Sequence, residues 1–146
     1  MIMDGHNLFS SAQAVFSAGT TVVSTNIIDL LKVAQDVGLG EPLYVSVTVT
    51  TAFAGGTSVT FNLITDDNTG MTSTATVYNM GTIPVASLTL AAQFNILFPI
   101  ALNIPMERYV GIGYLSTGTT TAGSVTAGIV RNAQKWTAFP SNYPTA

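Results

Sequence analysis

The stretch PLYVSVTVTTAFAGGTSVTFNLIT, residues 42–65, shows the clearest pattern in the chain. Every second residue from Leu43 to Val49 is apolar, and the same alternation runs from Val59 to Leu63. Successive side chains of a β-strand point to opposite faces, so a period of two is typical of a strand with one buried face. The stretch therefore predicts two half-buried strands.

A glycine pair, Gly55-Gly56, separates these two strands. Such a pair is a favoured two-residue turn between antiparallel strands, because glycine adopts positive φ without steric cost. We therefore expect residues 43–65 to form a β-hairpin.

Weaker alternation predicts further strands around residues 75–80, 93–100, 108–116 and 124–131, with a loop at 116–123. In the third of these stretches, RYVGIGYLS, the glycines leave room for a neighbouring side chain or backbone. Helix signals are limited to a turn or two near residues 28–37. About eight short strands with little helix and no βαβ alternation favour an all-β fold, an antiparallel β-sandwich of jelly-roll type.

The 146 residues suit one domain of ordinary size. We expect an N-terminal arm or first strand over residues 1–20, a jelly-roll domain over 21–135 and an extended aromatic tail over 136–146. For residues 12–23, a first strand of the domain's own sheet and a segment that contacts other chains are equally open.

Charge is scarce: 8% of the residues are charged and the net charge is −3, whereas about 25% is typical. The four cations, Lys32, Arg108, Arg131 and Lys135, are scattered, which argues against nucleic-acid binding. The most apolar window, residues 88–105, is interrupted by polar residues and prolines, which argues against a membrane span.

The chain offers little catalytic chemistry. It contains no cysteine and one histidine, His6, which is too few ligands for a zinc site and no basis for a catalytic triad. Asp66-Asp67 is the one acidic pair; a turn whose side chains bond the backbone is the simpler interpretation, and a calcium site is the alternative. We therefore expect no enzymatic activity, no cofactor and no metal.

Five blocks carry a resemblance when taken in order: MIMDGHNLFSSAQAV, STNIIDL, PLYVSVTV, RYVGIGY and GSVTAGIV, the last followed by Gln134. Together they resemble the capsid cement, or decoration, proteins of tailed phages, those of Bordetella short-tailed phages in particular. The resemblance covers about residues 1–135. It implies a jelly roll on the outer surface of the virion head that bridges major capsid protein subunits and forms homo-oligomers, dimers or trimers. It brings no catalytic residues.

This resemblance and the uncharged N-terminal stretch predict contacts to the shell or between chains, from residues up to about Thr25 and from a few others. The candidates are Asp4, Asn7, Phe9, Gln13, Val15, Asn26, Ile28, Arg108, Arg131, Trp136, Phe139 and Tyr143. The alternative function is a carbohydrate-binding jelly-roll module for host adhesion, suggested by Trp136, Tyr143 and the Asp66-Asp67 loop.

Overall fold

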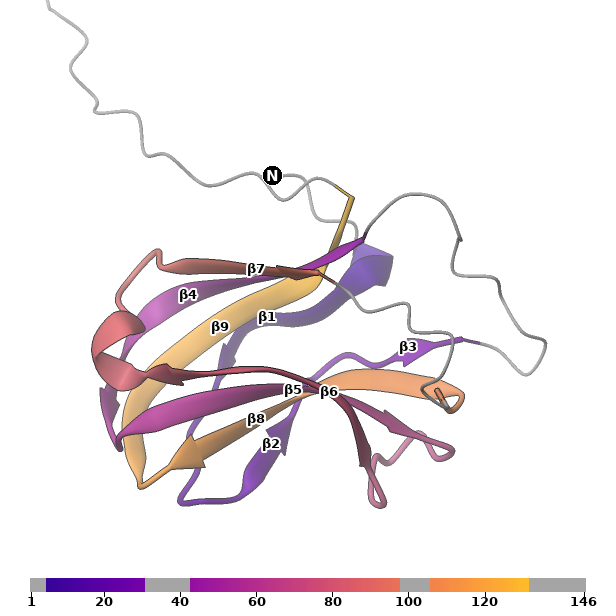
Figure 1. The fold of residues 1–146 in the computed structure, drawn as a ribbon, viewed down its shortest axis with the longest axis horizontal. Coiled ribbons are helices and arrows are strands. Elements are labelled where there is room, and N and C mark those ends of the chain that lie inside the picture. The colour runs from indigo at the N-terminus through magenta and orange to yellow at the C-terminus, as the bar shows by residue number, and fades with distance from the viewer. Residues whose placement is uncertain (1–4, 31–42, 98–105, 132–146) are drawn as a thin grey trace, which may run out of the picture.

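Two antiparallel β-sheets face each other in the computed structural model, which describes residues 5–30, 43–97 and 106–131 (Figure 1). The first sheet has the order β1 (Leu8–Ala14), β9 (Thr120–Val130), β4 (Tyr44–Gly55) and β7 (Gln93–Leu97). The second has the order β2 (Thr21–Val23), β8 (Tyr109–Thr117), β5 (Ser58–Asp66) and β6 (Ala75–Pro84), and β3 (Ile28–Asp29) also pairs with β8. Two short 3₁₀ helices are η1 (Gly5–Asn7) and η2 (Val85–Ser87). The predicted all-β sandwich is confirmed.

The strand order is that of a jelly roll. The first strand lies beside the last, and the connections β1–β2, β4–β5, β6–β7 and β8–β9 each cross from one sheet to the other. Such crossings produce the two interlocked Greek keys of this fold. Within the part of the chain that the structure describes, no helix is long and apolar enough to cross a membrane.

The predicted hairpin over residues 43–65 is wrong, although both of its strands exist. β4 pairs with β7 and β9, whereas β5 pairs with β6 and β8 in the other sheet. Gly55 and Gly56 have φ of +70° and +68°, and a Cβ on Gly55 would lie 2.6 Å from the carbonyl oxygen of Thr119. The turn therefore crosses between sheets and packs on the β8–β9 turn. A period of two identifies a buried face, but both sheets bury one, so it does not identify the partner strand.

The remaining predicted strands correspond to β6, β7, β8 and β9. β8 ends at Thr117 and β9 begins at Thr120, so the predicted loop over 116–123 is wrong except at residues 118 and 119, and β-branched threonines extend both strands. Ile28 and Asp29 form β3 rather than the start of a helix, and residues 31–37 of that prediction lie outside the described residues. The glycines of β8 do leave room: a Cβ on Gly113 would lie 2.9 Å from Thr21 Cγ2.

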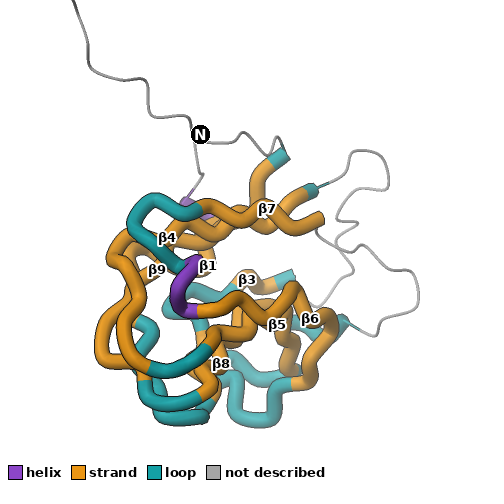
Figure 2. Tube along the Cα trace, turned by 60° about the vertical axis from the view of Figure 1, so that its left-hand side comes forward, coloured by secondary structure: helices purple, strands orange, loops and turns teal. Residues whose placement is uncertain are grey.

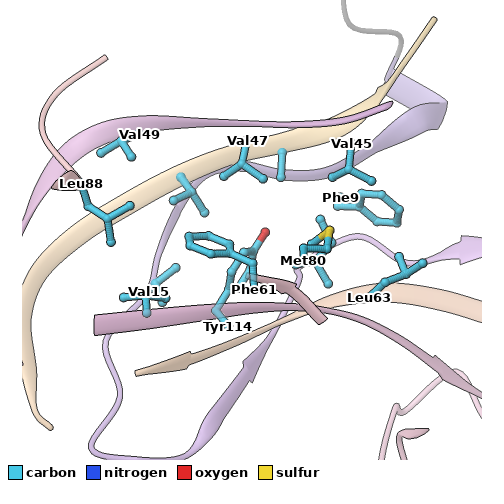
Figure 3. Close-up of a cluster of buried hydrophobic side chains, with 14 of the residues drawn as sticks. Phe9, Val15, Val45, Val47, Val49, Phe61, Leu63, Met80, Leu88 and Tyr114 are labelled. Atoms are coloured by element: carbon cyan, nitrogen blue, oxygen red, sulfur yellow. The ribbon is translucent and has the colours of Figure 1, made fainter. Parts of the chain in front are cut away.

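The core lies between the two sheets and contains side chains from both (Figure 3). Phe61 of β5 packs edge-on against Tyr114 of β8, with ring centroids 5.8 Å apart and an interplanar angle of 86°. The Tyr114 hydroxyl lies 2.7 Å from Ser10 Oγ on β1. Ser10 Oγ donates its own proton to Gln13 Oε1. The Tyr114 hydroxyl is therefore the donor in its hydrogen bond with Ser10 Oγ. Burial raises the pKa of Tyr114, which keeps the phenol neutral as this donor.

Candidate interaction surface

The jelly-roll connections alternate between the two ends of the sandwich. Antiparallel strand directions bring the β1–β2, β4–β5, β6–β7 and β8–β9 connections to one end, on the left of Figure 1. We call residues 15–20, 53–57, 85–92 and 117–121 at this end the uncharged end. Figure 2 brings it forward, with η2 in front. The other connections lie at the opposite end of the sandwich, together with the last residues of β3 and β5 and the first residue of β8.

Charge follows this division. None of the 4 Lys and Arg or 7 Asp and Glu residues falls in the uncharged end. The charged residues within the described ranges lie at the opposite end: Asp29, Asp66, Asp67, Glu107, Arg108 and Arg131. The strand registers show this directly, because Tyr109 pairs with both Asp29 and Asp66. The charge of the described residues is thus concentrated at one end.

Exposed apolar side chains favour the uncharged end. Among the described residues, the large hydrophobic side chains that are exposed are Phe16 at 55%, Leu90 at 67% and Tyr78 at 41%. Phe16 and Leu90 belong to the uncharged end, on the β1 and β4 sides of the first sheet, whereas Tyr78 lies on β6. Large apolar side chains exposed on a surface without charge are typical of protein contact sites.

Buried hydroxyls fix the loops of this end. Ser17 Oγ lies 2.6 Å from Ser116 Oγ, and the Ser17 N–H donates to Thr120 Oγ1 at 3.1 Å. Thr120 Oγ1 donates to the carbonyl oxygen of Val15 at 3.1 Å. The β4–β5 turn is held as well, because the Thr57 N–H donates to the Thr117 carbonyl at 2.7 Å. Loops held in this way lose little conformational entropy when they bind a partner.

At the opposite end, Arg108 is occupied within the chain. Its Nε and Nη2 donate to the two carboxylate oxygens of Asp29, each at 2.8 Å, and its guanidinium lies 4.9 Å from the ring centroid of Tyr109. The hydrogen bond to Asp29 raises the pKa of Arg108 above its ordinary value. This bidentate pair links β3 to β8. The Arg108 guanidinium therefore has hydrogen-bond partners within the chain, and its position needs no second protein to explain it.

The carboxylate of Asp66 is used to shape the β5–β6 loop. It accepts the Asn68 N–H at 2.9 Å and the Ser73 N–H at 2.8 Å. The loop then places Met71, which is 6% exposed, over the outer face of the second sheet, where a Cβ on Gly111 would lie 3.2 Å from Met71 Cε. Across the described ranges, no three His, Asp or Glu residues gather in a way that would hold a metal ion. The hydrogen bonds of the Asp66 carboxylate are therefore those of a turn whose side chains bond the backbone, as the first interpretation of Asp66-Asp67 predicted.

Asp66 predicts an acid-sensitive loop. The Asn68 N–H, and then the Ser73 N–H and hydroxyl, lower the pKa of Asp66 in the folded state. The stabilisation is therefore complete above the unfolded value of about 3.9 and is lost as the pH falls through the lower folded pKa. We expect D66N to be less stable than wild type at pH 7 and to lose less further stability on acidification. Thermal unfolding between neutral and acidic pH measures this.

The S73A variant is the control, because it removes one weak donor at 3.2 Å and keeps both backbone N–H donors. It should retain most of the wild-type pH dependence. Parallel pH profiles for D66N and wild type would contradict this role of Asp66.

The structure does not bring the sequence-predicted contact residues together. Phe9 and Val15 are both 0% exposed and belong to the domain's own core, so their prediction as contact residues is corrected. β1 pairs with β9 in the domain's own sheet, so this strand is not a free arm. Gln13 links β1 to β2, because its Nε2 donates to the Val23 carbonyl at 2.8 Å.

The other candidates are divided between the end opposite the uncharged end and the undescribed residues. Asn7, Asn26 and Arg131 are exposed, and Ile28 is half-buried against the core. Asp4, Trp136, Phe139 and Tyr143 lie outside the described residues. Sequence reasoning did not single out Phe16, although the predicted contact segment up to about Thr25 contains it, and it missed Leu90. The signal for them was present as four uncharged connections, but only the strand order shows that these connections share one end.

Taken together, these observations define a jelly-roll protein with an uncharged end at which Phe16 and Leu90 are exposed. The chain matches the Bbp16 family over residues 9–129, which is most of its length, and it belongs to that family, a Bordetella phage protein family. The predicted resemblance to a Bordetella phage protein is confirmed at this level. No curated protein matches the chain.

Proposed function

We propose that this chain is a structural virion protein, a capsid cement protein that binds the outer surface of a phage head and stabilises contacts between major capsid protein subunits. The observation that carries the proposal is the uncharged end, a rigid surface with exposed Phe16 and Leu90 on a chain of a phage family. Homo-oligomers, dimers or trimers, belong to the same proposal.

A phage head presents a repeating surface, so a modest affinity at each contact is sufficient for stable binding. Each copy of a cement protein meets the same environment many times over, and an oligomer engages several sites at once. The second contact is then effectively intramolecular, so avidity exceeds the affinity of a single contact by orders of magnitude. A small preorganised surface therefore suits a protein that coats a lattice.

Cosedimentation with heads tests the proposal. Purified protein mixed with undecorated heads of the cognate phage is expected to pellet with them and to saturate at a fixed ratio to the major capsid protein. Decorated heads should also retain their DNA to a higher temperature than undecorated ones, because bridged subunits resist internal pressure. Heads of an unrelated phage are the control, and protein that stays wholly in the supernatant would refute the cement function.

The carbohydrate-binding alternative now has less support from the described residues. The Asp66 carboxylate, suggested as part of a calcium site, is occupied by N–H donors of its own loop. Trp136 and Tyr143, the suggested stacking residues, lie outside the described residues.

A further inference from the structure

We propose that the uncharged end is the face that docks on the head, and that its target is an uncharged patch of the major capsid protein that carries apolar side chains. This inference rests on the proposed cement function and adds to it the contact face and the chemistry of the partner.

The separation of charge supports this choice of face. A charge that becomes buried in an interface must be paired and hydrogen-bonded, or its lost hydration weakens binding. Every connection at the uncharged end lacks such a charge, whereas the opposite end holds the Arg108–Asp29 pair with side chains 40% and 36% exposed. Burying the uncharged end in an interface therefore costs less desolvation free energy than burying the opposite end. By the same reasoning, a charged patch on the partner would find no counterion here, so the complementary patch is uncharged.

Phe16 and Leu90 provide the apolar contacts. Phe16 follows the buried Val15, and the buried Ser17 after it is bonded to Ser116 and Thr120, so its backbone is fixed on both sides. Leu90 lies two residues after the fully buried Leu88 and directly precedes Ala91, whose N–H donates to the Val49 carbonyl at 2.9 Å. Both side chains are thus held outward by buried or bonded neighbours. Preorganised apolar anchors of this kind dominate binding energy in protein interfaces.

The proposed cement function favours the shell over a second copy of this chain. The uncharged end is formed by four connections at one end of the sandwich. On a lattice several copies bind together, so a modest contact at this end suffices.

The first test compares three aspartate substitutions at exposed positions. F16D and L90D place an unpaired charge in the proposed contact, and Y78D places the same charge on β6, away from it. In cosedimentation with undecorated heads, F16D and L90D should each weaken binding by about tenfold or more, and Y78D should change it less than about twofold. Thermal unfolding of each variant separates lost binding from lost folding.

The second test is the salt dependence of wild-type binding. An interface without charge gains little from Coulomb attraction, so binding should change less than about twofold between roughly 0.05 M and 0.5 M salt. A steep loss of binding with salt would overturn the inference and point to the opposite end of the sandwich, which carries the charged residues.

The possible outcomes separate the two proposals. Wild-type protein that fails to bind heads refutes the cement function itself. Binding by wild type, F16D and L90D alike refutes only the assignment of the uncharged end. If F16D or L90D reduces the oligomer mass measured by light scattering without heads, the uncharged end contacts a second copy instead, and the assignment to the shell is overturned.

Discussion

Replacing Phe61 with alanine is expected to lower the free energy of unfolding by about 3–5 kcal/mol. Phe61 is 1% exposed and lies between the two sheets, with its ring edge-on to Tyr114 (Figure 3). The substitution removes the buried ring and leaves a cavity that the rigid strands on either side cannot fill. Since domains of this size are stable by only about 5–15 kcal/mol, F61A should show a much lower midpoint in chemical unfolding.

The matched control is Y78A, which removes an aromatic ring that is 41% exposed on the adjacent strand β6. We expect it to change the free energy of unfolding by less than about 1 kcal/mol. Equal losses in F61A and Y78A would mean that the core does not lie where the structure places it.

Replacing Gly123 with alanine should be nearly as damaging, at about 2–5 kcal/mol, from backbone strain and overpacking together. Gly123 has φ of +141°, and a Cβ there would lie 2.4 Å from Cδ1 of Phe53. Phe53 is itself 8% exposed, so its ring has little room to move aside. Alanine should therefore displace the ring or the strand, and a lowered denaturation midpoint measures this cost.

Replacing Gly81 with alanine separates the effect of backbone strain from the effect of overpacking. The φ of Gly81, +127°, is similar, but a Cβ there would meet nothing within 4 Å. G81A therefore carries the backbone strain without the steric clash, and we expect it to lose about 1–2 kcal/mol. If G81A and G123A lose the same amount, the Phe53 contact contributes nothing.

The sequence predicted the strands better than their arrangement. Alternation located β4 and β5 because each buries one face, and this pattern depends only on neighbouring residues. The hairpin between them was wrong because pairing depends on residues far along the chain: β4 takes its partners from β7 and β9. Local patterns therefore gave the all-β class, and the full strand order required the structure.

The candidate surface shows the same limit. Val15 and Phe16 are adjacent and similarly apolar, yet Val15 is 0% exposed and Phe16 is 55% exposed. Nothing in the local sequence says which of them faces the core. The distribution of charge along the chain was visible, but its meaning depends on which connections meet at one end of the sandwich, and the strand order alone decides that.

The pairing of β1 with β9 also sets an order of events during synthesis. Leu8 lies opposite Gly128, so the first strand has no partner until nearly the whole chain has been made. At roughly 5–20 residues per second, translation leaves Phe9 and its strand waiting on the order of ten seconds. Contacts between residues so distant in the chain also slow folding itself. A nascent chain of this protein thus leaves β1 without its strand partner until β9 has been made, and a shortened chain that lacks β9 would leave it unpaired permanently.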